Sequence, residues 1–134
     1  MNVTRSSVLQ LRNEQDIVAA RQAVRLVTQE LKFGLVDQTK MVTAASELAR
    51  NALVHGGGGA MTSEVLEDGV KKGLRLTFSD EGPGIPDVKL AMTDGWTSGT
   101  GMGLGLSGAK RLVNDFELDT QPGRGTRVTI TRWK

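Results

Sequence analysis

Two polar side chains, Glu47 and Asn51, stand four residues apart in the segment SELARN. In a helix this spacing places both on one face, about 5 to 6 Å apart at Cβ. An amide oxygen suits Mg²⁺, which takes only one or two protein oxygens and completes its shell with phosphates and water. A neighbouring carboxylate can act as a base toward an attacking hydroxyl or water. The pair therefore fits phosphoryl transfer, and the alternative is an ordinary solvated helix face.

Residues 99–106 read GTGMGLGL, with glycine at every second position and an apolar helical pattern directly after them. Because glycine reaches positive φ without steric cost, its N–H groups can approach anionic oxygens closely. A helix that starts here adds the partial positive charge of its N-terminus. The segment predicts a phosphate site, with a flexible glycine linker as the alternative. Upstream, residues 80–84 read DEGPG, where Asp80 is either a binding carboxylate or a turn former.

Neither of two common nucleotide folds explains these glycines. Residues 103–108 match the dinucleotide pattern GxGxxG, but residues 96–100 lack the pattern of the strand that must precede it. A P-loop needs Lys directly after its second glycine and then Ser or Thr. Here Ala109, Lys110 and Arg111 follow that glycine. The glycine run therefore belongs to neither class.

Composition limits the class of protein. The chain has 134 residues, a formal net charge of +2, no cysteine and 4% aromatic residues. This length suits one domain over residues 1–134, and the lack of cysteine excludes disulfides and thiol nucleophiles. The basic residues are scattered, which argues against nucleic-acid binding, and no apolar run suits a membrane span or a secretory signal. We expect a soluble cytoplasmic protein without a membrane segment.

The periodicity predicts two amphipathic helices near the start of the chain. Asn13 caps the first, which ends at a left-handed Gly34, and Asp37 caps the second, which ends before Gly56. Strands are expected at 8–11, 62–66, 73–79, 116–120 and 128–133, and further helices at 86–94 and 106–113. The fold class is therefore α+β, a two-layer α/β sandwich in which about three helices cover one face of a mixed, mainly antiparallel sheet.

Taken in order, the motifs resemble the N, G1, G2 and final boxes of the GHKL ATPase superfamily. They are Glu47-x-x-x-Asn51 on a helix, Asp80-x-Gly82-x-Gly84 after a strand, Gly99-x-Gly101-x-Gly103-x-Gly105 opening a helix, and Gly125-Thr126 before the last strand. The resemblance covers nearly the whole chain and implies the histidine-kinase-like ATPase fold. Residues 16–25, 33–51, 71–87 and 103–116 are most similar to the small bacterial serine/threonine kinases of partner switching, the stressosome switch kinases.

This resemblance implies a role for each matching residue. Asn51 is implied as the Mg²⁺ ligand, Glu47 as the general base for the substrate hydroxyl, and Arg50 as a neighbour that holds the site or the phosphates. Asp80 is implied to accept from the adenine amine, and Thr126 to complete adenine recognition. The other implied ATP-binding residues are Gly82, Gly84, Ile85, Gly99, Thr100, Gly101, Met102, Gly103, Leu104, Gly105 and Leu106. The glycine run would form a lid over the triphosphate, and residues 95–105 are expected to be the most mobile part of the core without nucleotide.

The resemblance also implies a reaction and partners. The chain shows no phosphoacceptor histidine on a dimerisation helix and has no room for a transducer domain, so we expect a free-standing module that phosphorylates another protein. The implied substrate is a STAS-domain antagonist or scaffold, after which the released kinase would activate a PP2C-type phosphatase or another effector. The alternative is an anti-sigma factor that sequesters a sigma subunit and uses ATP mainly as a conformational ligand. His55, the only histidine, is expected to be structural.

Overall fold

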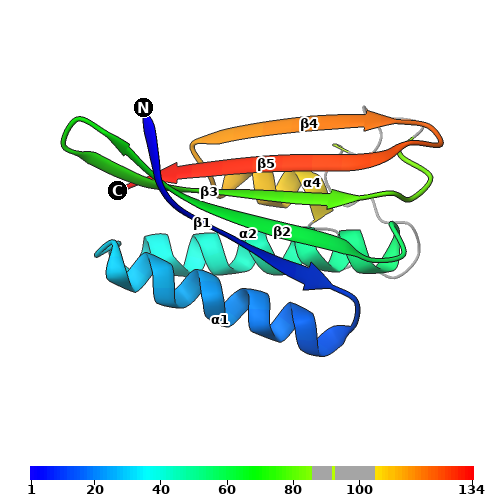
Figure 1. Cartoon of the computed structure of the whole chain (residues 1–134), viewed down its shortest axis with the longest axis horizontal. Helices are drawn as coiled ribbons and strands as arrows, with labels where there is room; N and C mark the ends of the chain where they lie inside the picture. Colours follow the sequence, from blue (N-terminus) through cyan, green and yellow to red (C-terminus); the bar gives the residue numbers. More distant parts are fainter. Residues whose placement is uncertain (86–91, 93–104) are drawn as a thin grey trace.

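A computed structural model describes residues 1–85, 92 and 105–134, with helices on one face of a five-stranded sheet (Figure 1). The strands are β1 (Asn2–Leu11), β2 (Gly59–Asp68), β3 (Lys71–Asp80), β4 (Asp115–Gln121) and β5 (Gly125–Trp133). The described helices are α1 (Glu14–Glu30), α2 (Leu35–Val54) and α4 (Gly105–Arg111). The strand order is β1-β2-β3-β5-β4, and these neighbours pair antiparallel. The arrangement confirms the predicted α+β two-layer sandwich.

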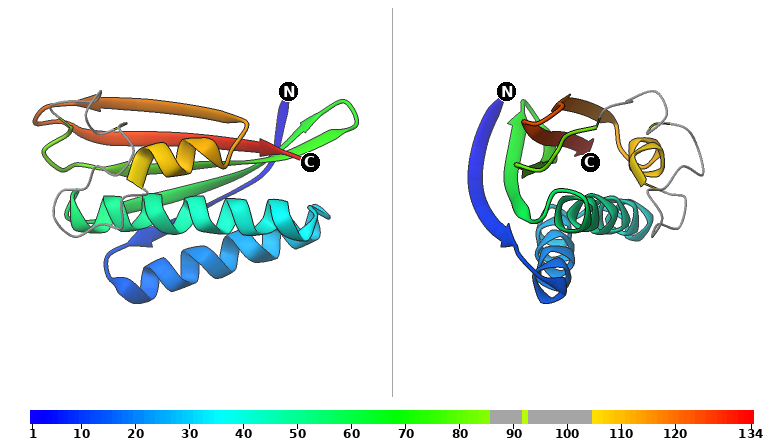
Figure 2. Two further views of the ribbon diagram at one scale, coloured as in Figure 1. Left: turned by 180° about the vertical axis from the view of Figure 1, so that it is seen from behind. Right: turned by 90° about the vertical axis from the view of Figure 1, so that its right-hand side faces the viewer.

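The sheet has one buried face and one open face because apolar residues alternate along its strands. In β3, Leu74, Leu76 and Phe78 are buried, whereas Arg75 and Thr77 between them line a hollow on the opposite face. Figure 2 shows α1, α2 and α4 on the same side of the curved sheet. One cluster of buried apolar residues joins these helices to the sheet.

The start of α1 agrees with the sequence prediction. The side-chain oxygen of Asn13 accepts a hydrogen bond from the Asp16 N–H at 2.9 Å, which confirms Asn13 as the N-cap. Ile17, Ala20 and Val24 follow at helical spacing and are buried. The apolar stripe therefore sets which face of α1 packs on the core.

The link between α1 and α2 differs from the prediction. The left-handed residue is Lys32, with φ of 63°, while Gly34 has φ of −62° and is the N-cap of α2. Gly34 therefore begins α2 rather than ending α1. Asp37 is not a cap either, because it lies in the first turn of α2 and its carboxylate accepts a hydrogen bond from Arg132 of β5. The Phe33 N–H donates to the carbonyl of Thr28 at 2.9 Å, which is the bond that closes a helix end with a left-handed residue just before it, and that residue is Lys32.

Several elements differ in length from the prediction. β2 extends beyond residues 62–66 at both ends, and β5 begins at Gly125 rather than at residue 128, so Gly125 and Thr126 lie in this strand and not before it. β1 begins at Asn2 rather than near residue 8, because it pairs with β2 along almost its whole length. α4 ends at Arg111 instead of continuing to residue 113. The helix expected at 86–94 lies outside the described residues, apart from Met92. None of the described helices is both long and apolar enough to cross a bilayer.

Candidate functional site

The inner face of the sheet changes from apolar to polar at one end. Read across the strands, the last inner row consists of Leu11, Gly59, Asp80, Thr126 and Thr120. The row before it is apolar and consists of Leu9, Met61, Phe78, Val128 and Leu118. One carboxylate and two hydroxyls therefore border an apolar floor. Such an edge suits a flat ligand that carries its polar groups on one side.

The end of α2 meets this polar row at Gly56. A Cβ on Gly56 would lie 2.5 Å from Cβ of Asp80 and 2.7 Å from the Ala52 carbonyl oxygen, so only glycine fits there. Gly82 donates its N–H to Oδ1 of Asp80 at 2.9 Å, and a Cβ on Gly82 would lie 2.6 Å from Cα of Gly56. Asp80 is thereby held between two glycines. The sequence prediction used Gly56 only as the end of α2 and missed this contact.

The loop after β3 rests on the turn between β4 and β5. Gly84 has φ of 77°, and a Cβ there would lie 2.8 Å from the carbonyl carbon of Gln121. Gly125 has φ of 92°, and a Cβ there would lie 2.9 Å from Cα of Glu81. The Gly123 N–H also donates to the carbonyl of Pro83 at 2.7 Å. Backbone packs directly on backbone here, and two of the predicted glycines make the close approach possible.

Two threonine hydroxyls complete the row. Oγ1 of Thr120 lies 2.9 Å from Oγ1 of Thr126 and accepts a hydrogen bond from the Ile85 N–H at 2.9 Å. A hollow of about 190 Å³ at this end of the sheet is lined by Asp80 and these two threonines together with Ser79, Asp119 and Arg127 of the open face, so it lies at the edge of the sheet. Ile85, which was predicted, contributes its backbone to the frame of the site. Thr120 was not predicted as a site residue. The alternation along β4 could have indicated it, because Thr120 is the polar residue on the inner face of this strand, where Phe116 and Leu118 are apolar.

Glu47 and Asn51 lie one turn apart on α2, toward the end that meets Asp80. Both are half-buried, and no hydrogen bond joins either side chain to another described residue. Arg50 is exposed and donates from Nη1 to Oε1 of Glu14 at 2.9 Å, so its side chain is directed to the first turn of α1. Its predicted role in the site stays a prediction. Among the described residues no three His, Cys, Asp or Glu side chains gather as a metal-binding group, and the role of Asn51 as Mg²⁺ ligand stays a prediction.

The residues after the predicted lid are anchored in the core. α4 begins at Gly105, with φ of 41°, and packs against α2. Leu106 is 5% exposed and belongs to the core cluster. Six predicted lid residues lie outside the described part of the chain, namely Gly99, Thr100, Gly101, Met102, Gly103 and Leu104. The expected mobility of the lid stays a prediction for the same reason.

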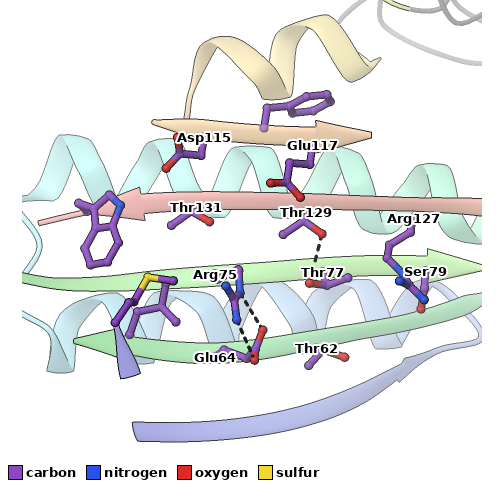
Figure 3. A pocket seen from close by; sticks show the side chains of 14 residues that line it. Thr62, Glu64, Arg75, Thr77, Ser79, Asp115, Glu117, Arg127, Thr129 and Thr131 are labelled. Carbon is purple, nitrogen blue, oxygen red and sulfur yellow. Dashed lines mark hydrogen bonds and ion pairs between the residues drawn. The ribbon is translucent and has the colours of Figure 1, made fainter. Parts of the chain in front are cut away.

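A larger hollow of about 700 Å³ lies on the open face of the sheet (Figure 3). Its centre is the ion pair of Arg75 with Glu64, in which Nε and Nη2 reach the two carboxylate oxygens at 2.9 and 3.1 Å. These hydrogen bonds, with the nearby charge of Glu117, raise the pKa of Arg75. The guanidinium is therefore already paired and is not available to a phosphate.

The sequence also matches a family model. Residues 36–134 match the family described as histidine kinase-, DNA gyrase B- and HSP90-like ATPase. The chain belongs to this family, which is a family of ATP-binding domains. The matched range contains Glu47, Asn51, Asp80 and Thr126, all of which the sequence motifs had singled out.

Within the family, the chain is similar to a serine/threonine-protein kinase, RsbT of Bacillus subtilis (strain 168). The two are 46% identical over 127 residues, which are 95% of this chain and 96% of that protein. An anti-sigma F factor of Bacillus licheniformis is 30% identical over 84% of this chain and 81% of its own length. A solved structure, the RsbU and RsbW domains of a Mycobacterium tuberculosis protein, matches with a TM-score of 0.67 and 21% identity over 98% of this chain and 33% of that chain. The last comparison shows the fold alone.

Proposed function

We propose that this chain is a cytoplasmic, ATP-dependent protein serine/threonine kinase of a partner-switching pathway. Its substrate is a serine or threonine of a STAS-domain antagonist or scaffold protein, and after release it binds and activates an effector such as a PP2C-type phosphatase. The similarity to a serine/threonine-protein kinase over 95% of the chain supports the reaction class. The observation that carries the site is the polar row of Asp80, Thr126 and Thr120 beside the end of α2.

The base of the nucleotide lies on this row in our proposal. Asp80 accepts from the adenine amine, Thr126 meets the ring edge, and Gly82 and Gly84 let the backbone pass close to the base. The apolar floor formed by residues such as Phe78 and Val128 suits the faces of a purine. The glycine run would form the lid in this proposal, with the N–H groups of residues 102–106 as donors to the phosphates.

Asn51 would hold Mg²⁺ through its amide oxygen. The fit is chemical, because this oxygen is a hard donor on a half-buried side chain with no competing hydrogen bond in the described part of the chain. When bound, Mg²⁺ neutralises charge on the phosphates. No histidine or thiol is needed for such a site.

Glu47 would serve as the general base. Its carboxylate takes the proton of the substrate hydroxyl while that oxygen forms a bond to the γ-phosphorus. The bond between this phosphorus and the oxygen that bridges it to the β-phosphate breaks, and ADP leaves with the electron pair. Positioning and charge stabilisation carry most of such catalysis, and a base adds about 10²- to 10⁴-fold.

Two substitutions separate these roles. Glu47→Ala is expected to retain Mg-ATP binding and to lose about 10²- to 10⁴-fold of transfer to a STAS protein, whereas Asn51→Ala weakens nucleotide binding itself. Transfer is measured with radiolabelled ATP and binding by calorimetric titration. Glu30→Gln is the control, because Glu30 is an exposed carboxylate paired with Arg5. Transfer by Glu47→Ala at the parent rate would show that Glu47 is not the base.

An anti-sigma factor is the second candidate, and the Bacillus licheniformis relative favours it. In that case the chain would sequester a sigma subunit and use ATP as a conformational ligand. Co-purification followed by a phosphate-transfer assay separates the two candidates. Recovery of a sigma subunit, with no phosphorylated STAS serine or threonine, would favour the anti-sigma factor and rule out the kinase pathway proposed first.

A further inference from the structure

We propose that the outward side of α2 is the surface on which the substrate protein docks. The substrate then surrounds its acceptor hydroxyl with carboxylates and carries an apolar side chain at each end of the contact. The inference rests on the proposed function, in which Glu47 takes the proton of that hydroxyl. A row of α2 side chains, apolar at its ends and cationic on both sides of Glu47, carries it.

α2 has one narrow outward side. Its buried residues belong to the core, and Figure 2 shows α2 lying between α1 and α4 in the view from behind. Among its other positions, one set recurs every three or four residues, which is the spacing of a single helix face. This outward row consists of Val36, Lys40, Thr43, Glu47, Arg50 and Val54. At a rise of about 1.5 Å per residue, the outward row is about 27 Å long.

Glu47 lies inside the outward row, which ties the row to the substrate. A general base must come within hydrogen-bonding reach of the proton that it takes. A protein that brings a serine or threonine hydroxyl to Glu47 therefore also covers the helix turns on either side of it. The composition of those turns then selects which protein surface fits.

Both ends of the outward row are apolar and exposed. Val36 is 67% exposed, and Val54 is 47% exposed. Covering such side chains stabilises a complex, because apolar surface is removed from water. The matching substrate surface therefore presents an apolar side chain to each valine.

Cations lie on both sides of Glu47 in the row. Lys40 forms no ion pair with any carboxylate in the described part of the chain. Arg50 is paired with Glu14, but these side chains are 47% and 65% exposed, so the pair contributes little and Arg50 can accept a second carboxylate. Along the helix, Lys40 lies about 10 Å from Glu47 on one side and Arg50 about 5 Å on the other. The row is thus complementary to carboxylates that flank the acceptor on both sides.

A second copy of this chain fits the outward row poorly. In a twofold interface, residue i meets residue j and j meets i. If Val36 of one copy met Val54 of the other, Lys40 of each copy would lie opposite Arg50 of the other, because both pairs are centred on the same point of α2. These like charges repel, so the charges favour an acidic substrate protein as the occupant.

The test measures the initial rate of transfer from radiolabelled ATP to the STAS protein that the parent phosphorylates, with the concentration of each substrate varied in turn. We expect Lys40→Glu to raise the KM for the STAS protein about fivefold to tenfold at low salt, and to stay within about twofold of the parent at about 0.5 M salt, because salt screens exposed charges. Val36→Asp should raise this KM about 5- to 20-fold at both salt concentrations. Aspartate is tolerated there, because Val36 lies in the first turn of α2.

The value of kcat and the KM for ATP should stay within about twofold of the parent in both variants, since neither side chain takes part in the proposed chemistry. The matched controls are Lys71→Glu and Val70→Asp. Both residues are exposed and lie at the turn between β2 and β3, so both controls should transfer phosphate like the parent.

An unchanged KM for the STAS protein in either variant overturns the inference, as does an equal rise in the KM for ATP. A parent that sediments as a dimer and becomes monomeric with Val36→Asp would assign the outward row to a second copy, which also overturns it. A parent that phosphorylates no STAS protein refutes the proposed function, and the inference with it. An active parent with unchanged variants refutes the inference alone.

Discussion

Replacing Gly56 with alanine tests whether the end of α2 positions the carboxylate of Asp80, which we propose binds the nucleotide base. A Cβ there would lie 2.5 Å from Cβ of Asp80, and ordinary van der Waals contact begins at 3.4 Å. Asp80 or the helix end must therefore move by at least about 0.9 Å, the difference between these two distances, because Cγ of Asp80 lies closer still to the built Cβ. No positive φ is recorded at Gly56, so the backbone itself accepts alanine and the whole effect is steric.

The expected magnitude follows from the hydrogen bond that this shift breaks. The Gly82 N–H lies 2.9 Å from Oδ1 of Asp80, and an added 0.9 Å takes the pair out of hydrogen-bonding range. Hydrogen bonds to charged groups contribute roughly 1.5 to 3 kcal/mol. We expect Gly56→Ala to weaken ATP binding by roughly 10- to 100-fold and to lower the free energy of unfolding by about 1 to 3 kcal/mol through overpacking.

The assay is calorimetric titration with ATP, accompanied by chemical unfolding of each variant. Gly57→Ala is the matched control, because Gly57 is the next residue, has φ of 74°, and has nothing within 4 Å of a built Cβ. Its positive φ lowers stability by about 1 to 2 kcal/mol, but its ATP affinity should stay within about twofold of the parent. A folded Gly56→Ala variant with parental ATP affinity would refute the idea that this contact places Asp80.

Two further predictions concern stability away from the site. Leu66 is fully buried although it lies on the open face of the sheet, in the row that includes Gly73 and Trp133, so Leu66→Ala should lower the free energy of unfolding by about 2 to 4 kcal/mol and leave ATP affinity unchanged. A hydrogen bond from the Arg12 N–H, with support from its guanidinium, lowers the pKa of Asp16. The ionised Asp16 carboxylate therefore stabilises the fold above its pKa in the unfolded chain, and this contribution is lost as the pH falls through its pKa in the folded protein. In urea unfolding, the difference in free energy of unfolding between the parent and Asp16→Asn should shrink between about pH 5 and pH 3. A difference that stays constant over this range, or Leu66→Ala unfolding like the parent, would contradict these expectations.

Local signals predicted those parts of the fold that depend on neighbouring residues. The Asn13 cap and the alternation of Leu74, Leu76 and Phe78 are of this kind, since each is written in a few consecutive residues. Gly34 was placed wrongly because glycine is the usual left-handed residue at a helix end, whereas Lys32 takes that conformation here. The length of β1 was missed because it is set by pairing with β2.

The candidate site divides in the same way. Asp80 and Thr126 were predicted because they stand in motifs of the family, and the structure places them side by side on neighbouring strands. Gly56 and Thr120 were not predicted as site residues, because their contacts are with residues distant in the sequence; Thr120 meets Ile85 across 35 positions. The residues next to a glycine or a threonine in the sequence do not indicate that it contacts a residue far away in the chain.

The packing of residues 81–85 on the β4–β5 turn has a consequence for engineering. Any insertion in this turn displaces the loop that carries Gly84, so the turn has no freedom in length. The β2–β3 turn at the other end of the sheet has that freedom, because a side chain at Gly69 would meet nothing within 4 Å and Val70 is 98% exposed. A fluorophore or affinity tag inserted between β2 and β3 would report on this protein without touching the end of the sheet at which we propose that nucleotide binds.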